Sequence, residues 1–308
     1  MVSEARWKLR NRFVCFVFVV KISLLVFITI NVPRVVKAES LPVAMVLPSV
    51  FSFETGGDVE SNRNLYLDLD AGFESGPRVV FSFSSNRSEN NNETVITRSV
   101  LVGVRSNPMA FLSGGLDIEQ WGNDNTLIID TLRLALEINA EQWSFSLRPQ
   151  WRTLTLSTDC IDIISARCDA NIKVKSTGAA FDVNYYAEGP WLFSMGFARQ
   201  RYDRNVAVLG TDRRLQYIFS SATLDLATGL EGRRSRLGAS YFLDDSSWSV
   251  SWLRSVSEVT GDASVIIALR YSTDLNEQWG LSLNLGRQAL AGTSEKIEFA
   301  GMGLSYRW

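Results

Sequence analysis

The chain has 308 residues, with 33 acidic and 31 basic side chains and no histidine. The missing imidazole excludes Ser-His-Asp and Cys-His catalysis, histidine metal sites and the usual proton shuttle near neutral pH. The arginines are scattered along an acidic chain, which argues against binding to nucleic acid. No phosphate-binding glycine loop or zinc spacing occurs either. We therefore expect no enzymatic activity, no cofactor and no metal site.

Residues 1–38 have the pattern of a secretory signal. A basic start is followed by an apolar stretch over 13–30, and Ala38 offers a small residue for cleavage before Glu39. The alternative is a retained helical anchor, but this stretch is near the lower length limit for a membrane span and Lys21 interrupts it. Without the signal, the chain carries 24 basic and 32 acidic residues. Residues 39–62 are either a periplasmic segment or contain the first strand.

From residue 63 to 308, apolar and polar side chains alternate with the period of two that is typical of β-strands with one apolar face. We predict strands over 65–73, 79–83, 100–104, 112–118, 132–138, 143–151, 181–185, 191–197, 213–226, 237–243, 248–252, 265–271, 279–285 and 300–308. No linker-like composition interrupts them, so one domain is expected over 63–308. Aromatic residues favour the strand ends, as interfacial girdles require: Phe73, Trp121, Trp143, Trp191, Trp248, Trp279 and Trp308.

The final strand is apolar at every second position, from Ala300 through Met302, Leu304 and Tyr306 to Trp308. It resembles the closing strand of Gram-negative outer-membrane β-barrels such as porins, with Trp in place of the usual Phe. The resemblance implies a transmembrane antiparallel up-and-down barrel, all-β, of about 14 strands, with 12 or 16 also open. It also implies that Met302, Leu304, Tyr306 and Trp308 form an assembly signal, read by the barrel-assembly machinery. Lipids of the cell outer membrane would surround the barrel. The alternative is a soluble β-sandwich or solenoid.

Short turns and longer polar links alternate as far as residue 212, as expected for periplasmic turns and outer loops. Between there and 244 the alternation slips by one strand. Residues 213–233 could hide a hairpin, Pro48 to Phe53 could be the true first strand, or one turn could be misplaced.

Cys160 and Cys168 lie in the longest link and are the two cysteines left after signal removal. An oxidising periplasm would join them in a disulfide that braces the loop. A two-cysteine metal site without histidine is the weaker interpretation.

Charged residues on the polar face are the candidates for the lining of the lumen. Spacing by two places each of the pairs Asp68/Asp70 and Asp117/Glu119 on one face of a strand. Arg133, Glu137, Arg148 and Arg152 fall on the inferred inner face of the next strands. Opposed acidic and basic walls would form a solute-selecting constriction. The alternative is a plug of structural salt bridges in a closed barrel.

A basic cluster surrounds one link and contains Arg199, Arg201, Arg204, Arg213 and Arg214. If this link is extracellular, the arginines would hold lipopolysaccharide phosphates. If it is periplasmic, they form a solvated turn.

The function expected from these patterns is a passive porin-like channel for small hydrophilic solutes. The alternative is a non-conducting barrel with a structural, adhesion or envelope-assembly role. The sequence does not define the solute or the oligomeric state.

Overall fold

The computed structural model describes residues 48–60, 62–73, 76–90, 93–106, 111–123, 127–156, 172–203, 230–290 and 296–308. The expected signal over 1–38 lies outside these ranges, as do the predicted strand over 213–226, Cys160 and Cys168, and Arg204, Arg213 and Arg214. Within the described residues, no helix is long and apolar enough to span a membrane.

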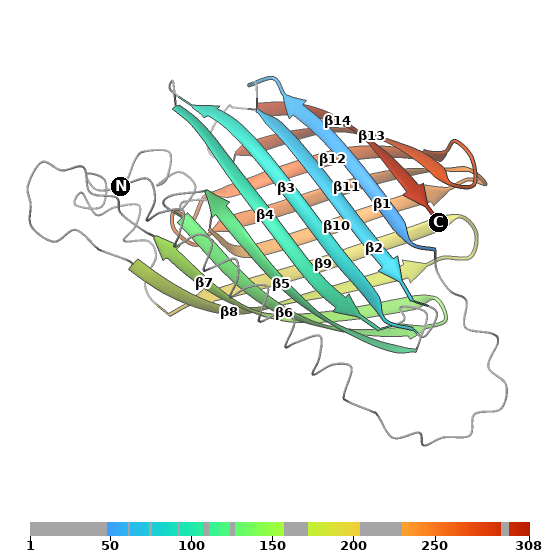
Figure 1. The fold of residues 1–308 in the computed structure, drawn as a ribbon, viewed down its shortest axis with the longest axis horizontal. Coiled ribbons are helices and arrows are strands. Elements are labelled where there is room, and N and C mark those ends of the chain that lie inside the picture. The colour runs from blue at the N-terminus through green and yellow to red at the C-terminus, as the bar shows by residue number, and fades with distance from the viewer. Residues whose placement is uncertain are drawn as a thin grey trace, which may run out of the picture. The chain divides into compact units, whose positions relative to one another are not determined.

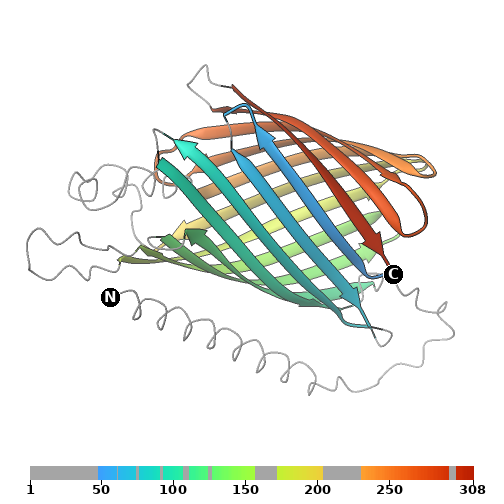
Figure 2. The same cartoon turned by 45° about the horizontal axis from the view of Figure 1, so that its top comes forward.

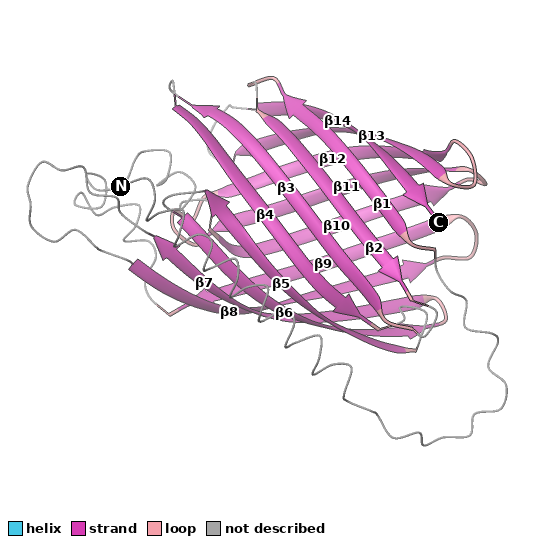
Figure 3. Ribbon diagram, in the orientation of Figure 1, coloured by secondary structure: helices cyan, strands magenta, loops and turns pink. Residues whose placement is uncertain are grey.

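The described residues form fourteen strands that close into one antiparallel barrel (Figures 1 and 3). The strands are β1 (Val50–Asp58), β2 (Arg63–Gly72), β3 (Arg78–Asn90), β4 (Glu93–Arg105), β5 (Leu112–Asn123), β6 (Leu127–Ala140), β7 (Trp143–Leu156), β8 (Ile172–Tyr186), β9 (Trp191–Tyr202), β10 (Glu231–Phe242), β11 (Ser246–Ser257), β12 (Ala263–Asp274), β13 (Trp279–Leu290) and β14 (Lys296–Arg307). Each strand pairs with its sequence neighbours, and β14 pairs with β1. This order confirms the expected up-and-down barrel of about 14 strands.

Apolar side chains on the outer wall explain why the alternating sequence folds in this way. Four apolar side chains of β6 are exposed: Leu132, Leu134, Leu136 and Ile138. Thr131, which directly precedes Leu132, is buried. The paired strands keep this parity, so exposed Phe145 on β7 lies beside Ile138. A barrel with an apolar exterior and a polar interior suits a lipid surrounding, because closure satisfies the backbone hydrogen bonds without water.

The closing contact brings the two ends of the barrel sequence together. The backbone N–H of Ser49 donates to the carbonyl of Trp308 at 3.2 Å, and the N–H of Trp308 donates back to Ser49 at 3.2 Å. The short turns lie at this end, where Figure 2 also shows the carboxyl end of β14. Gly189 occupies one of these turns with a φ of 97°, a conformation that most side chains disfavour. We call this end the short-turn end and the opposite end the long-link end.

The first strand lies earlier than the barrel start at residue 63 that the alternation suggested. β1 runs from Val50 to Asp58, inside the segment 39–62, and this is one of the alternatives left open above. Its alternation is hard to see because Gly56 and Gly57 interrupt it. The slip in parity disappears as well, because β10 pairs directly with β9. With β1 included, the described strands number fourteen, and the strand predicted over 213–226 lies outside the described residues.

An aromatic belt surrounds the outer wall at the short-turn end of β7 to β14. Tryptophan and tyrosine face each other on adjacent strands, with ring centroids 4.5 to 4.9 Å apart in the pairs Trp143–Tyr185, Trp191–Tyr241, Trp248–Tyr271 and Trp279–Tyr306. Such amphipathic rings favour the boundary between lipid and water. The prediction for Trp121 was wrong: its ring packs with the inner apolar cluster, because its position shares parity with the lumen-facing residues of β5.

A small apolar cluster lies on the inner face at the long-link end. Its buried members are Leu127, Ile129, Leu154, Leu156, Val174, Leu230 and Val259, with Trp121, Ile172 and Tyr202 packed against them. Leu127 and Leu156 are 0% and 1% exposed. Most of the barrel interior is polar, so this cluster gives one sector of the mouth, between β5 and β11, a different character.

Candidate functional site

The strand register places the eight lumen candidates on the inner face. Asp68 lies exposed between Ser52 and Ser82, and Asp70 two residues later shares its face. Asp117 pairs in register with Arg133, and Gln150 of β7 continues the row. The register thus places these side chains on the lumen wall, and their contact with a solute stays a prediction.

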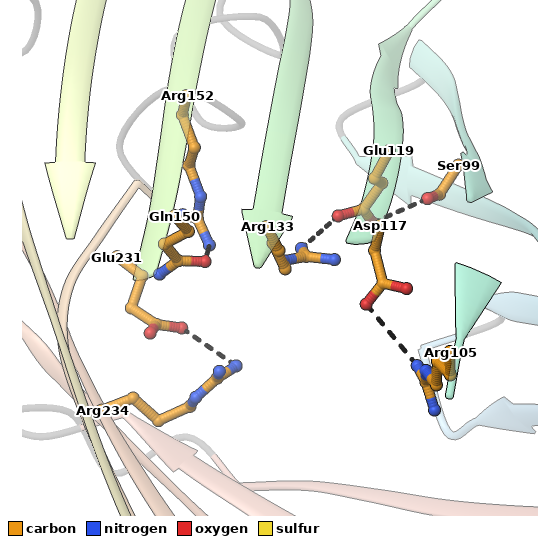
Figure 4. A network of polar contacts seen from close by, with 9 residues as sticks. All are labelled: Ser99, Arg105, Asp117, Glu119, Arg133, Gln150, Arg152, Glu231 and Arg234. Atoms are coloured by element: carbon orange, nitrogen blue, oxygen red, sulfur yellow. Dashed lines mark hydrogen bonds and ion pairs between the residues drawn. The ribbon is translucent and has the colours of Figure 1, made fainter. Parts of the chain in front are cut away.

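Two acidic residues of β5 contact side chains of the neighbouring strands β4 and β6. Asp117 is buried and lies 3.5 Å from a guanidinium nitrogen of Arg105 on β4. Glu119 accepts hydrogen bonds from Arg133 on β6 and from Ser99 on β4, the latter at 2.9 Å. Figure 4 shows these side chains extending between adjacent strands. The contacts therefore run along the wall.

Asp182 on β8 is the centre of a second network. Its carboxylate accepts hydrogen bonds from Arg148 on β7 and, at 2.8 Å, from Arg236 on β10. Gly196 of β9 lies between Asp182 and Arg236, and a β-carbon there would come within 2.2 Å of the Asp182 Oδ1 atom. The glycine leaves the space that the carboxylate occupies. One buried acid thereby links four consecutive strands.

Two further pairs cross intervening strands at positions that carry small residues. Arg270 on β12 lies 3.4 Å from Glu54 on β1 and donates to Ser282 of β13 at 3.2 Å. Near the short-turn end, Arg307 on β14 donates to Asp274 on β12 at 2.7 Å. Because the residues on the intervening strands are small, such as Ser282 and Gly280 of β13, the arginine side chains can extend along the inner face to reach the acids.

Arg152 differs from the other arginines of the inner face. Its guanidinium donates to Gln150 at 3.4 Å, and its Nε atom is buried without a hydrogen-bond partner. Among the residues that the structure describes, no carboxylate lies within ion-pair distance of Arg152. Leu154, two residues along the same face, belongs to the apolar cluster. Figure 4 shows Arg152 and Gln150 on one strand and the Glu231–Arg234 pair on another. Among the described arginines of the inner face, Arg152 is thus the one without a carboxylate partner.

The remaining lumen candidates lie toward the short-turn end. Asp70 accepts a 2.8 Å hydrogen bond from Arg78, whose guanidinium also donates to the carbonyl of Pro48 at 3.0 Å. Glu137 accepts a hydrogen bond from Ser144 at 2.8 Å. Asp70, Glu137 and Arg148 together line one hollow of the inner wall. The structure therefore brings candidates from three separate strands to one surface.

Sequence reasoning missed several charged residues of the same surface: Glu54, Arg78, Arg105, Asp182, Glu231, Arg234, Arg236, Arg270, Asp274 and Arg307. The parity of each strand could have identified Arg236, because it alternates with the outward Leu237. Parity could not have shown that Arg236 reaches Asp182, which is 54 residues away in the sequence.

The residues of the expected assembly signal lie on the outer face of β14. Met302, Leu304 and Trp308 are exposed, and the rings of Tyr306 and Trp308 stack with centroids 6.0 Å apart. These side chains lie on the outside of the folded barrel. Recognition by the assembly machinery stays a prediction, as does the disulfide between Cys160 and Cys168. Within the described ranges, no group of three metal-binding side chains gathers.

Comparison with known proteins reveals similarity in structure alone. No protein-family description and no curated protein matches the sequence. Among solved structures, the barrel resembles the CymD monoaromatic hydrocarbon channel with a TM-score of 0.54 at 7% identity, over 86% of this chain and 89% of that one. Two others are OpdK of Pseudomonas aeruginosa with vanillate (TM-score 0.41, 8% identity, 85% and 97% covered) and a loop-deleted OmpT of Vibrio cholerae (0.43, 8%, 84% and 98%). The similarity to CymD shows that the chain has the fold of an outer-membrane channel barrel.

Proposed function

We propose that this protein is a passive porin-like channel of the bacterial outer membrane that conducts small hydrophilic solutes. The observation that carries the proposal is the direction of the ion pairs on the inner face. Arg133–Glu119 and Arg148–Asp182 join adjacent strands. Among the described ion pairs, Arg270–Glu54 spans the most strands, because it crosses two intervening ones. In a closed ring of fourteen strands, opposite walls are seven strands apart. Pairs of this reach brace the wall and do not plug the lumen.

The charges on that wall suit a channel for polar solutes. Both acidic and basic side chains occur on the inner face, as in the pairs Arg133–Glu119, Arg148–Asp182 and Arg270–Glu54, so the wall carries charges of both signs. Arg152 has no carboxylate partner in the described structure, so its positive charge on the inner face is not neutralised by an ion pair. The chain contains no histidine, which supports a role in transport over one in catalysis.

One observation favours the alternative of a non-conducting barrel. The apolar cluster around Leu127 and Leu156 is buried on the inner face at the long-link end, where a solute would enter. An apolar constriction can block ions by excluding water. A barrel that is closed in this way would serve a structural, adhesion or assembly role.

Conductance of the purified full-length chain in planar bilayers separates the two functions. Stable ohmic steps are the expected result. Silence from protein that is correctly folded, as shown by a shift in gel mobility on heating, would reject the channel and favour the closed barrel. Separation of inner and outer membranes from the producing cells tests the location, and recovery in the inner membrane would contradict it.

A further inference from the structure

A patch of cations lies on the outer wall at the long-link end of β8 to β11. We define this basic outer patch by Lys173, Lys175, Arg199, Arg201, Arg233 and Arg254, and all six side chains are exposed. On β9, Arg199 and Arg201 follow the outward Phe197 with the same parity. The patch therefore faces the surroundings of the barrel and not its lumen.

Like charges in this patch lie directly beside each other. Arg199 of β9 pairs in register with Arg233 of β10, which places their β-carbons about 5 Å apart. Directly opposed like charges destabilise a sheet unless an anion compensates them. Among the described residues, no carboxylate lies within ion-pair distance of either arginine. Two acids lie close in the sequence. Asp203 accepts a hydrogen bond from the backbone N–H of Lys175 at 3.0 Å, and Glu231 lies 3.5 Å from a guanidinium nitrogen of Arg234.

An open hollow on the outer wall adjoins these arginines. Thr177, Ala179, Phe181 and Phe197 line it together with Arg199 and Arg201. Phe181 and Phe197 lie opposite each other in register and form its apolar part, whereas Ala179 opposite Arg199 leaves room because its side chain is small. An apolar hollow with two guanidinium groups at one end matches a molecule that has an acyl chain and an anionic head group.

The position of the basic outer patch along the barrel axis indicates which molecule of this kind it binds. Long links of outer-membrane barrels face the cell exterior, and the Trp–Tyr belt marks the opposite boundary. The patch then lies in the outer leaflet, whose lipid is lipopolysaccharide. We infer that the basic outer patch binds the phosphates of lipid A, with an acyl chain in the hollow at Phe181 and Phe197. This inference rests on the proposed outer-membrane location.

The chemistry of arginine supports the assignment. The planar guanidinium donates two parallel hydrogen bonds to phosphate oxygens, and these charge-assisted bonds are about twice as strong as neutral ones. A phosphate between Arg199 and Arg233 removes their mutual repulsion, and Arg201 lies two residues further along the same face. The lysines of β8 add positive charge on the neighbouring strand.

Native mass spectrometry of the detergent-solubilised full-length protein tests the inference, with purified bisphosphorylated lipid A as the added lipid. We expect the protein to bind it about tenfold more tightly than dephosphorylated lipid A or phosphatidylglycerol, because the patch offers several phosphate-binding cations. The double variant R199Q/R201Q should lose about tenfold in affinity for bisphosphorylated lipid A. Equal binding of the three lipids, or unchanged affinity of the double variant, would overturn the inference.

R287Q is the matched control, because Arg287 also faces outward near the long-link end but pairs in register with Glu298. Its affinity for lipid A should equal that of the unmodified protein, and an equal loss in R287Q would overturn the specific site. If R199Q/R201Q does not fold, K173Q/K175Q removes charge from the same patch and should weaken binding. Conductance of R199Q/R201Q in lipid-A-free bilayers should be unchanged, so failure of the lipid site and failure of the channel give separate results.

Discussion

Asp182 and Gly196 oppose each other across β8 and β9, and the carboxylate occupies the space where a side chain at 196 would begin. The same arrangement recurs at Gly103, where a β-carbon would come within 2.1 Å of the Asp117 Oδ1 atom. In both places a glycine allows a buried acid to lie along the wall and to reach an arginine. Glycine therefore decides where the charged network of the lumen can form.

G196A should destabilise the barrel by about 1–3 kcal/mol, because the new methyl group displaces the Asp182 carboxylate and breaks its bond to Arg236. Unfolding by urea in lipid vesicles, followed by tryptophan fluorescence, measures the change. G114A is the matched control, since a β-carbon at 114 meets only the carbonyl of Ala135, at 3.5 Å. Equal midpoints for the two variants would contradict the role assigned to Gly196.

D182N should make the channel more selective for anions. The substitution leaves the charges of Arg148 and Arg236 without their shared carboxylate on the inner wall. We expect the permeability ratio of chloride to potassium to rise about twofold, measured as the reversal potential in a KCl gradient. D130N is the control, because Asp130 is exposed on the outer face and accepts a hydrogen bond from Gln120. A shift of the same size in D130N would show that the lumen is not the cause.

R148E/R152E should shift the selectivity in the opposite direction, toward cations. The two substitutions reverse two charges on the inward positions of β7 that flank Gln150, so we expect the permeability ratio to change several-fold. The same reversal-potential measurement applies, with the outward R287E as the comparison. Unchanged selectivity would remove Arg148 and Arg152 from the lining of the pore.

W308A should reduce the amount of assembled barrel in cells. Trp308 stacks on Tyr306, and its backbone bonds to Ser49 close the barrel and do not need the side chain. Refolding in detergent should therefore change little. W279A is matched, because Trp279 packs on the same Tyr306 with centroids 4.9 Å apart. If both variants assemble equally well in cells, Trp308 is not a separate assembly signal.

Cys160 and Cys168 should form a disulfide in the exported protein. Mass spectrometry after alkylation, with and without prior reduction, distinguishes the bonded pair from free thiols. Two alkylated cysteines without reduction, in protein taken from the cell envelope, would contradict the bond. Their positions lie outside the described residues, so the sequence alone supports this prediction.

Much of the fold was predictable because one rule governs every strand. A side chain in a transmembrane barrel faces either lipid or lumen, so the period of two that is visible in 132–138 and 300–308 reports directly on architecture. β1 remained only one of the alternatives for 39–62, because Gly56 and Gly57 carry no side chain that signals a face. Trp121 was misplaced for the opposite reason: its residue type suggested a girdle, whereas the parity of β5 places it inside.

The sequence by itself determined the class of fold, the inward parity of Asp117, Arg133 and Arg148, and the absence of histidine chemistry. These features depend on neighbours in the chain, and periodicity records such neighbours. Only the tertiary structure decided that Asp182 joins Arg148 to Arg236, and that Arg199 opposes Arg233 on the outer wall. These contacts depend on the register between strands, which hydrogen bonding and turn geometry set across the barrel and which local sequence does not encode.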